Sequence, residues 1–153
     1  MTGERSRDNV KRELPQCPDI FHPGDLDAYL NDISDYSAKM VGNKVDNKEG
    51  NKVDNKEKVT TSQIRNIFSR IKKLEALAKK DPDSDNCIAD VKRLRVQFAY
   101  NSGRNSENPI YRDFMNDLDE LAQKIKTNRD VLRFYEFVEA IVAYMKYHGG
   151  EKA

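Results

Sequence analysis

The apolar residues after position 60 recur at helical spacing, and this spacing constrains the fold more than any other feature of the sequence. In four stretches they return every third or fourth residue, which places them on one face of a helix. The first stretch carries Ile64, Ile67, Phe68, Ile71, Leu74 and Ala78. The chain has no Trp and only 7 Gly and 5 Pro among 153 residues, which argues against a β-sandwich or barrel. The sequence therefore predicts an all-α fold.

Capping residues set the ends of the predicted helices. Thr60 and Gln63 have the spacing of a capping box, in which each side chain satisfies a backbone N–H of the other residue. Asn108 followed by Pro109 supplies a cap and a first helical residue for another helix. Asn128 is the expected cap of the last one. We expect helices over about residues 25–40, 60–81, 85–103, 108–125 and 128–147.

The length and composition fit one helical domain with a modest core. Hydrophobic residues make up 37% of the chain and charged residues 35%, as in a helical protein with much wet surface. The last predicted helix is apolar on most sides, so we expect it at the centre of the bundle. We predict a compact bundle of about five helices in one domain, 19–150, preceded by a disordered polar arm, 1–18.

An internal repeat separates the first predicted helix from the others. The octad Gly42–Glu49 is followed at once by an identical octad, Gly50–Glu57. One Val in eight residues buries little apolar surface, so we interpret residues 41–58 as a flexible loop that tolerated a tandem duplication. A repeated peptide ligand is the alternative interpretation.

Positive charge is concentrated in the middle of the chain, although the formal net charge is only +1. Residues 62–104 hold ten Lys/Arg against five Asp/Glu. Arg65 and Lys72 are seven residues apart, so they lie on one flank of a helix, and Arg95 and Arg104 can extend this surface from the next helix. Such a surface can bind the phosphates of a nucleic acid with little sequence preference. A solvated face without a ligand is the alternative.

Two tyrosines near helix ends are candidates for stacking on nucleic-acid bases. Tyr100 and Tyr147 are each near the end of a predicted helix, where a ring can stack on an unpaired base. The alternative is that both rings belong to the core and expose only their hydroxyl groups.

Catalysis has little support in the sequence. Asp113, Asp117 and Glu120 share one side of a helix and invite a metal-dependent nuclease hypothesis, but they face away from the apolar stripe and have no nearby His. A wet acidic surface is the favoured interpretation, and docking of a basic neighbour is a further alternative. His22 and His148 belong to no catalytic constellation, and the chain has no glycine-rich phosphate loop. We predict no catalytic residue, no metal and no cofactor.

The cysteines and the hydropathy indicate a soluble protein of the cytoplasm. Cys17 and Cys87 are far apart and lack CxxC spacing, so we expect neither a disulfide framework nor a zinc site. No apolar run approaches the length of a membrane span, and we expect no membrane partner.

Three short phrases in the second half of the chain carry a family resemblance. They are TTSQIR at 60–65, FAYNSGR at 98–104 and EAIVAY at 139–144, the last within a helix that closes on Gly149 and Gly150. In this order and spacing they resemble the small subunit of type III-A CRISPR (Csm) effector complexes, over about residues 59–150.

The resemblance implies a helical, non-catalytic subunit that acts in antiviral defence. Members of this family assemble in several copies beside the backbone subunits, and their basic residues line the channel in which target RNA pairs with guide RNA. The implied partners are thus both RNAs, the backbone subunit, the large signature subunit and further copies of the chain. Cleavage and nucleotide synthesis belong to other subunits. A helical protein–protein adaptor without RNA binding is the alternative.

The predicted RNA contacts have two sources. Arg65 and Arg104 are carried over from the matching phrases. Lys72, Arg95, Arg129 and Lys146 are added from charge and helix geometry.

Overall fold

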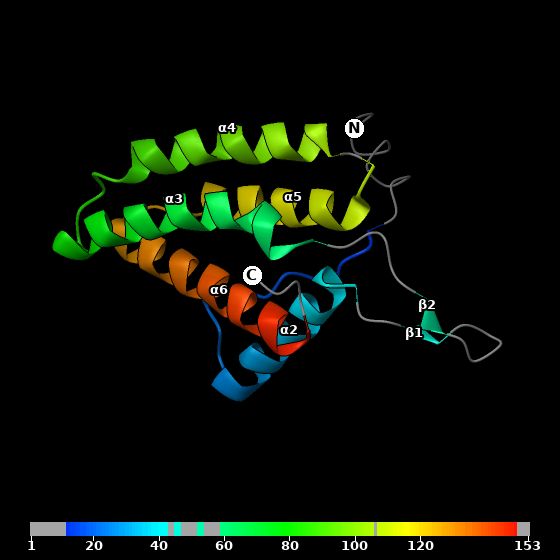
Figure 1. The fold of residues 1–153 in the computed structure, drawn as a ribbon. Coiled ribbons are helices and arrows are strands. Elements are labelled where there is room, and N and C mark those ends of the chain that lie inside the picture. The colour runs from blue at the N-terminus through cyan, green and yellow to red at the C-terminus, as the bar shows by residue number, and fades with distance from the viewer. Residues whose placement is uncertain (1–11, 43–44, 47–51, 54–58, 106, 150–153) are drawn as a thin grey trace, which may run out of the picture.

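The computed structural model of the chain describes residues 12–42, 45–46, 52–53, 59–105 and 107–149. Five α-helices and one pair of very short strands lie in these ranges (Figure 1). The helices are α2 (Leu26–Met40), α3 (Thr61–Lys80), α4 (Ile88–Arg104), α5 (Pro109–Gln123) and α6 (Asn128–Tyr147). The strands are β1 (Val45–Asp46) and β2 (Lys52–Val53). The prediction of a helical bundle is confirmed.

The predicted caps are present at two of the helices. Thr60 accepts a hydrogen bond from the backbone of Gln63 at 3.2 Å, and the Gln63 side chain accepts one from the backbone of Thr60 at 2.9 Å. Asn108 caps α5 through the backbone N–H of Tyr111, with Pro109 as the first helical residue. These local bonds begin α3 and α5 where the sequence predicts.

The cap of α6 is Thr127, so the prediction of Asn128 as cap is wrong. Asn128 is fully buried instead, and it accepts a hydrogen bond from the backbone of Cys87 at 3.1 Å. Its amide donates to the carbonyl of Asp81 at 2.9 Å and to the side chain of Asn86 at 2.8 Å. This residue therefore fastens the α3–α4 connection to the start of α6.

The helices pack around α6. This helix lies against α3 on one side and α2 on another, while α4 packs mainly on α5 (Figure 1). Phe98 of α4 meets Phe134 of α6 with ring centroids 6.4 Å apart. Tyr36 of α2 lies 6.3 Å from both Phe114 of α5 and Phe137 of α6. The core is thus one connected cluster with α6 in the middle. None of the described helices has the length and apolarity needed to cross a bilayer.

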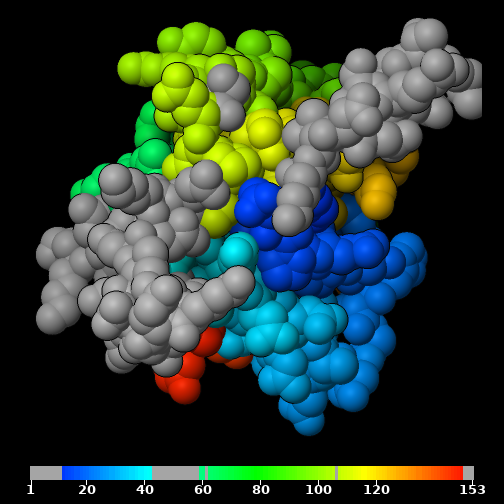
Figure 2. All heavy atoms as spheres, turned by 90° about the vertical axis from the view of Figure 1, so that its right-hand side faces the viewer, coloured from blue at the N-terminus to red at the C-terminus, as the bar shows by residue number. Residues whose placement is uncertain are grey.

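Residues 12–20 run across α5 and α2 as an ordered segment, here called the N-terminal strap (Figure 2). Leu14, Pro18 and Ile20 of the strap are buried. Residues 12–18 fall within the arm over 1–18 that the sequence predicts to be disordered, and the remainder of that arm, 1–11, lies outside the described residues. Polar groups on α5 hold the strap against the bundle.

The repeat region brings its two ends together. The backbone N–H of Val59 donates to the carbonyl of Met40 at 2.6 Å, and Val59 is buried. The two strands are antiparallel and pair Val45 with Val53, which occupy the same position in the two octads. The rest of the expected flexible loop beyond residue 42 lies outside the described residues.

Candidate nucleic-acid interface

Arg65 and Lys72 lie at the edge where α3 meets α6. They come three residues before and four residues after Phe68, so all three side chains share one flank of α3. The Phe68 ring stacks on Tyr135 of α6 at 5.7 Å, which fixes this flank as the one that faces α6. Both cations are exposed, and in the described ranges neither forms an ion pair.

Lys146 lies on the matching flank of α6. It is eleven residues beyond Tyr135, about three helical turns, so it points to the same side of α6. It is exposed in the last turn and forms no ion pair with a described residue. We call Arg65, Lys72 and Lys146 the α3/α6 basic flank.

Arg104 ends α4 at the end of the bundle where α3 begins, because α3 and α4 run in opposite directions (Figure 1). The guanidinium is exposed and lies near the Tyr111 phenol, where it partly opposes the rise that burial causes in the pKa of Tyr111. Tyr100 is one turn earlier on the same helix face and is 57% exposed. Arg65 and Arg104 therefore lie at one end of the molecule, with an exposed aromatic ring beside Arg104.

The two proposed stacking tyrosines are both exposed. Tyr147 is 78% exposed and packs edge-on against His148, with ring centroids 5.1 Å apart. His148 in turn shares a 2.9 Å hydrogen bond with the hydroxyl of Ser34 on α2. The alternative of core tyrosines is therefore wrong for Tyr100 and Tyr147.

Arg95 and Arg129 are held by carboxylates and stand apart from the other predicted contacts. Arg95 donates from Nε to Asp119 of α5 at 2.8 Å, so it bridges α4 and α5. Arg129 donates to Asp83 in the α3–α4 connection at 2.7 Å, at the opposite end of the bundle from Arg104. Exposed pairs of this kind contribute about 0–1 kcal/mol, so a phosphate would compete with a weak existing partner.

The structure adds a basic groove between α3 and α4 that the sequence prediction missed. Its rim holds Arg70 and Lys73 from α3 with Arg93 and Asp90 from α4, around a volume of about 260 Å³. Three leucines complete the lining: Leu74, Leu77 and Leu94. The spacing of Arg70, Lys73 and Leu77 places them on one flank of α3, but only the packing shows that this flank faces α4.

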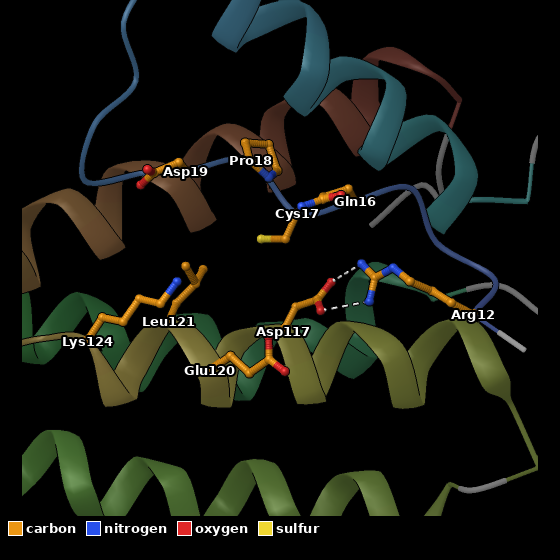
Figure 3. Close-up of a pocket in the computed structure, with 9 residues that line it drawn as sticks. All are labelled: Arg12, Gln16, Cys17, Pro18, Asp19, Asp117, Glu120, Leu121 and Lys124. Atoms are coloured by element: carbon orange, nitrogen blue, oxygen red, sulfur yellow. Dashed lines mark hydrogen bonds and ion pairs between the residues drawn. The ribbon is translucent and has the colours of Figure 1, made fainter. Parts of the chain in front are cut away.

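The prediction of a wet acidic surface on α5 is wrong for Asp113 and Asp117, which are buried, whereas Glu120 is exposed. Asp117 is only 4% exposed, and Arg12 of the strap donates to its two oxygens at 2.7 and 3.0 Å (Figure 3). The Tyr36 hydroxyl donates to the same carboxylate. Asp113 is buried as well and accepts from the backbone N–H groups of Glu13 and Leu14. The two aspartates hold the strap in place.

A cleft of about 630 Å³ remains between the strap and α5, but its groups are poorly suited to catalysis (Figure 3). Burial raises the pKa of the Cys17 thiol to about 12, so it stays protonated and is a weak nucleophile near neutral pH. Among the described residues, no three His, Cys, Asp or Glu side chains come together in a way that could hold a metal ion. Asp117 and Asp113 are already bound by strap groups.

Comparison with known proteins identifies the family. The profile of the family described as Csm2 Type III-A matches residues 35–151, which include all three phrases and helices α3 to α6. The chain belongs to the Csm2 Type III-A family. It is 39% identical over 99 residues to the Streptococcus thermophilus protein named CRISPR system Cms protein Csm2. The aligned residues cover 61% of this chain and 75% of that protein.

A second relative with the same name comes from Enterococcus italicus. It is 28% identical over 95 residues, which cover 59% of this chain and 68% of that protein. No solved structure matches the chain. Membership of the Csm2 family makes the chain a small subunit of a type III-A CRISPR effector complex, in which it assembles with other Csm subunits.

Proposed function

We propose that the chain is a non-catalytic subunit that contacts the backbone of target RNA, and of its duplex with guide RNA, in the cytoplasm. The observation that carries the proposal is a set of exposed cations at one end of the bundle and along the α3/α6 basic flank. None of them forms an ion pair with a residue that the structure describes. Arg65 and Arg104 mark the end, and Lys72 and Lys146 extend the flank. Arg95 and Arg129 are secondary contacts, because each would have to leave a carboxylate.

The chemistry of an RNA-guided complex agrees with such a surface. Base pairing between guide and target reads the sequence, so the protein has only to recognise the charged backbone and its shape. Cations that are free of carboxylates neutralise phosphates without first breaking an ion pair. Asp113 and Asp117, the residues that a nuclease would need, are buried in structural bonds with the strap, which supports a non-catalytic role.

We further propose that several copies line the complex beside its backbone subunits. A family of small subunits that contacts an extended RNA duplex needs a repeated, sequence-blind surface, and a single 153-residue chain covers only part of such a duplex. The backbone subunit, the large signature subunit and copies of the chain are the expected protein partners.

The test compares two double variants in the reconstituted Csm complex. Arg65→Ala with Arg104→Ala should weaken target RNA binding alike for unrelated sequences. The slope of log affinity against log salt should flatten by about 1.4 per bound copy, or about 0.7 for each lost phosphate contact. Lys126→Ala with Arg133→Ala removes the same charge from exposed positions outside the proposed surface and serves as the control.

Equal slopes for the wild type and both variants would contradict the proposed RNA contacts and favour the protein–protein adaptor. A loss confined to one target sequence would also contradict the proposal, because backbone contacts carry no sequence information.

A further inference from the structure

We propose that the groove between α3 and α4 receives the first turn of α2 from a second copy of the chain. This inference rests on the proposed assembly of several copies and names the two surfaces that would join them. It assigns the groove to protein and leaves the α3/α6 basic flank to RNA.

The groove combines an apolar floor with a cationic rim. Leu77 is 47% exposed although it sits beside Leu74 and Leu94 in the floor. Arg70 and Lys73 on the rim form no ion pair with a described residue. A partner that fits must therefore bring a small apolar side chain flanked by carboxylates.

The first turn of α2 has these properties. Leu26 is 61% exposed, because the turn that carries it extends past the helices that cover the rest of α2. Asp25 precedes it and Asp27 follows it, and Asp32 lies farther along the helix. All three aspartates are exposed, and none forms an ion pair within the described ranges. An exposed leucine between two aspartates is the complement of an apolar groove with a basic rim.

The two surfaces cannot meet within one molecule. The α3/α4 edge and the first turn of α2 lie on opposite sides of the bundle (Figure 1, Figure 2). A contact between different patches on two copies is heterologous, and it continues as an open chain when the rotation between copies does not close a ring. In such a row only the two end copies keep an unoccupied surface: a groove at one end and a leucine at the other.

Other occupants fit the groove less well. A volume of about 260 Å³ is below the range of about 300–1,000 Å³ that is usual for small-molecule sites, but it accommodates a single side chain. RNA would place its charged backbone against three leucines and against Asp90, which is on the rim and holds Arg93 at 2.6 Å. An acidic turn can instead pair with Arg70 and Lys73 while its leucine covers Leu77.

Disulfide crosslinking between two differently marked copies tests the contact. One copy carries Leu26→Cys and the other Leu77→Cys, both with Cys17→Ser and Cys87→Ser, and both are assembled into the Csm complex before mild oxidation. We expect a crosslinked heterodimer at least tenfold above the yield from Leu26→Cys mixed with Val96→Cys. Val96 is 71% exposed on the outer face of α4 and is the matched control.

A charge variant separates this inference from the proposed function. Arg70→Glu with Lys73→Glu should abolish the crosslink and reduce the copy number in the complex, while the salt slope for target RNA, expressed per bound copy, stays unchanged. If the crosslink is no stronger than the control, the contact is wrong even when RNA binding is normal. If the charge variant instead lowers the salt slope and leaves the copy number intact, the groove is an RNA surface and the inference is overturned.

Discussion

Asp117→Asn gives the sharpest test of how the strap is held. Asp117 accepts from the Arg12 guanidinium through both oxygens and from the buried Tyr36 hydroxyl. The substitution keeps the shape of the side chain but removes its charge, and its amide turns one acceptor of the Arg12 pair into a donor. Burial and the Asp117 carboxylate both hold the Tyr36 pKa well above its ordinary value, so that phenol stays a donor and can still bond to the remaining oxygen.

The expected loss follows from these contacts. Hydrogen bonds to charged groups contribute about 1.5–3 kcal/mol each. The substitution removes at least one of the two hydrogen bonds between Arg12 and Asp117 and weakens the other. Arg12 is 42% exposed, so water partly replaces its lost partner, whereas Asp117 is buried. We expect docking of the strap onto the bundle to become less favourable by about 2–4 kcal/mol. Glu120→Gln changes an exposed carboxylate in the same cleft and should change stability by less than about 0.5 kcal/mol.

The assay combines thermal unfolding with the reactivity of Cys17. If the strap unfolds together with the bundle, the loss corresponds to a Tm lower by roughly 4–16 °C at this chain length. The folded Cys17 thiol has a pKa of about 12 because of burial, so at pH 8 it is protonated and slow to alkylate. A released strap returns the thiol toward its ordinary pKa of about 8.5, which raises its alkylation rate.

Two results would refute this reasoning. An unchanged Tm together with an unchanged Cys17 alkylation rate would show that the Arg12–Asp117 pair does not hold the strap. Equal effects from Asp117→Asn and Glu120→Gln would show that charge in the cleft matters and that the specific bonds do not.

Two further predictions concern stability. Asn128→Ala should lower the free energy of unfolding by about 2–4 kcal/mol, because it leaves the buried N–H of Cys87 without a side-chain acceptor and frees the carbonyl of Asp81; urea denaturation measures it, and a change below 1 kcal/mol would contradict the proposed fastening role. Deleting residues 50–57 should leave both Tm and target RNA affinity unchanged, because the contact between Val59 and Met40 joins the ends of the loop without the second octad. A clear loss of either quantity would favour a functional role for the repeat.

Local interactions made the helices predictable from sequence. The apolar spacing that begins at Ile64 and the caps at Thr60 and Asn108 depend on residues within a few positions of each other, and they reappear in the structure. Arg65 and Arg104 were identified from their phrases and are exposed in the structure. Their contact with RNA stays a prediction.

Long-range contacts decided the features that the sequence prediction missed. Periodicity puts Asp117 away from the apolar stripe, but it cannot show that Arg12, 105 positions earlier, covers that face. In the same way, Arg95 is a free cation in the sequence and a partner of Asp119 in the fold.

The sequence by itself therefore determined the helices, the family and the positively charged region, because each depends on residue types at short spacing. The tertiary structure alone decided which charges remain free, where the strap lies and which flanks of α3 and α4 form a groove. The reason is physical: the availability of a charged group depends on its neighbours in space, and packing brings those neighbours from distant parts of the chain.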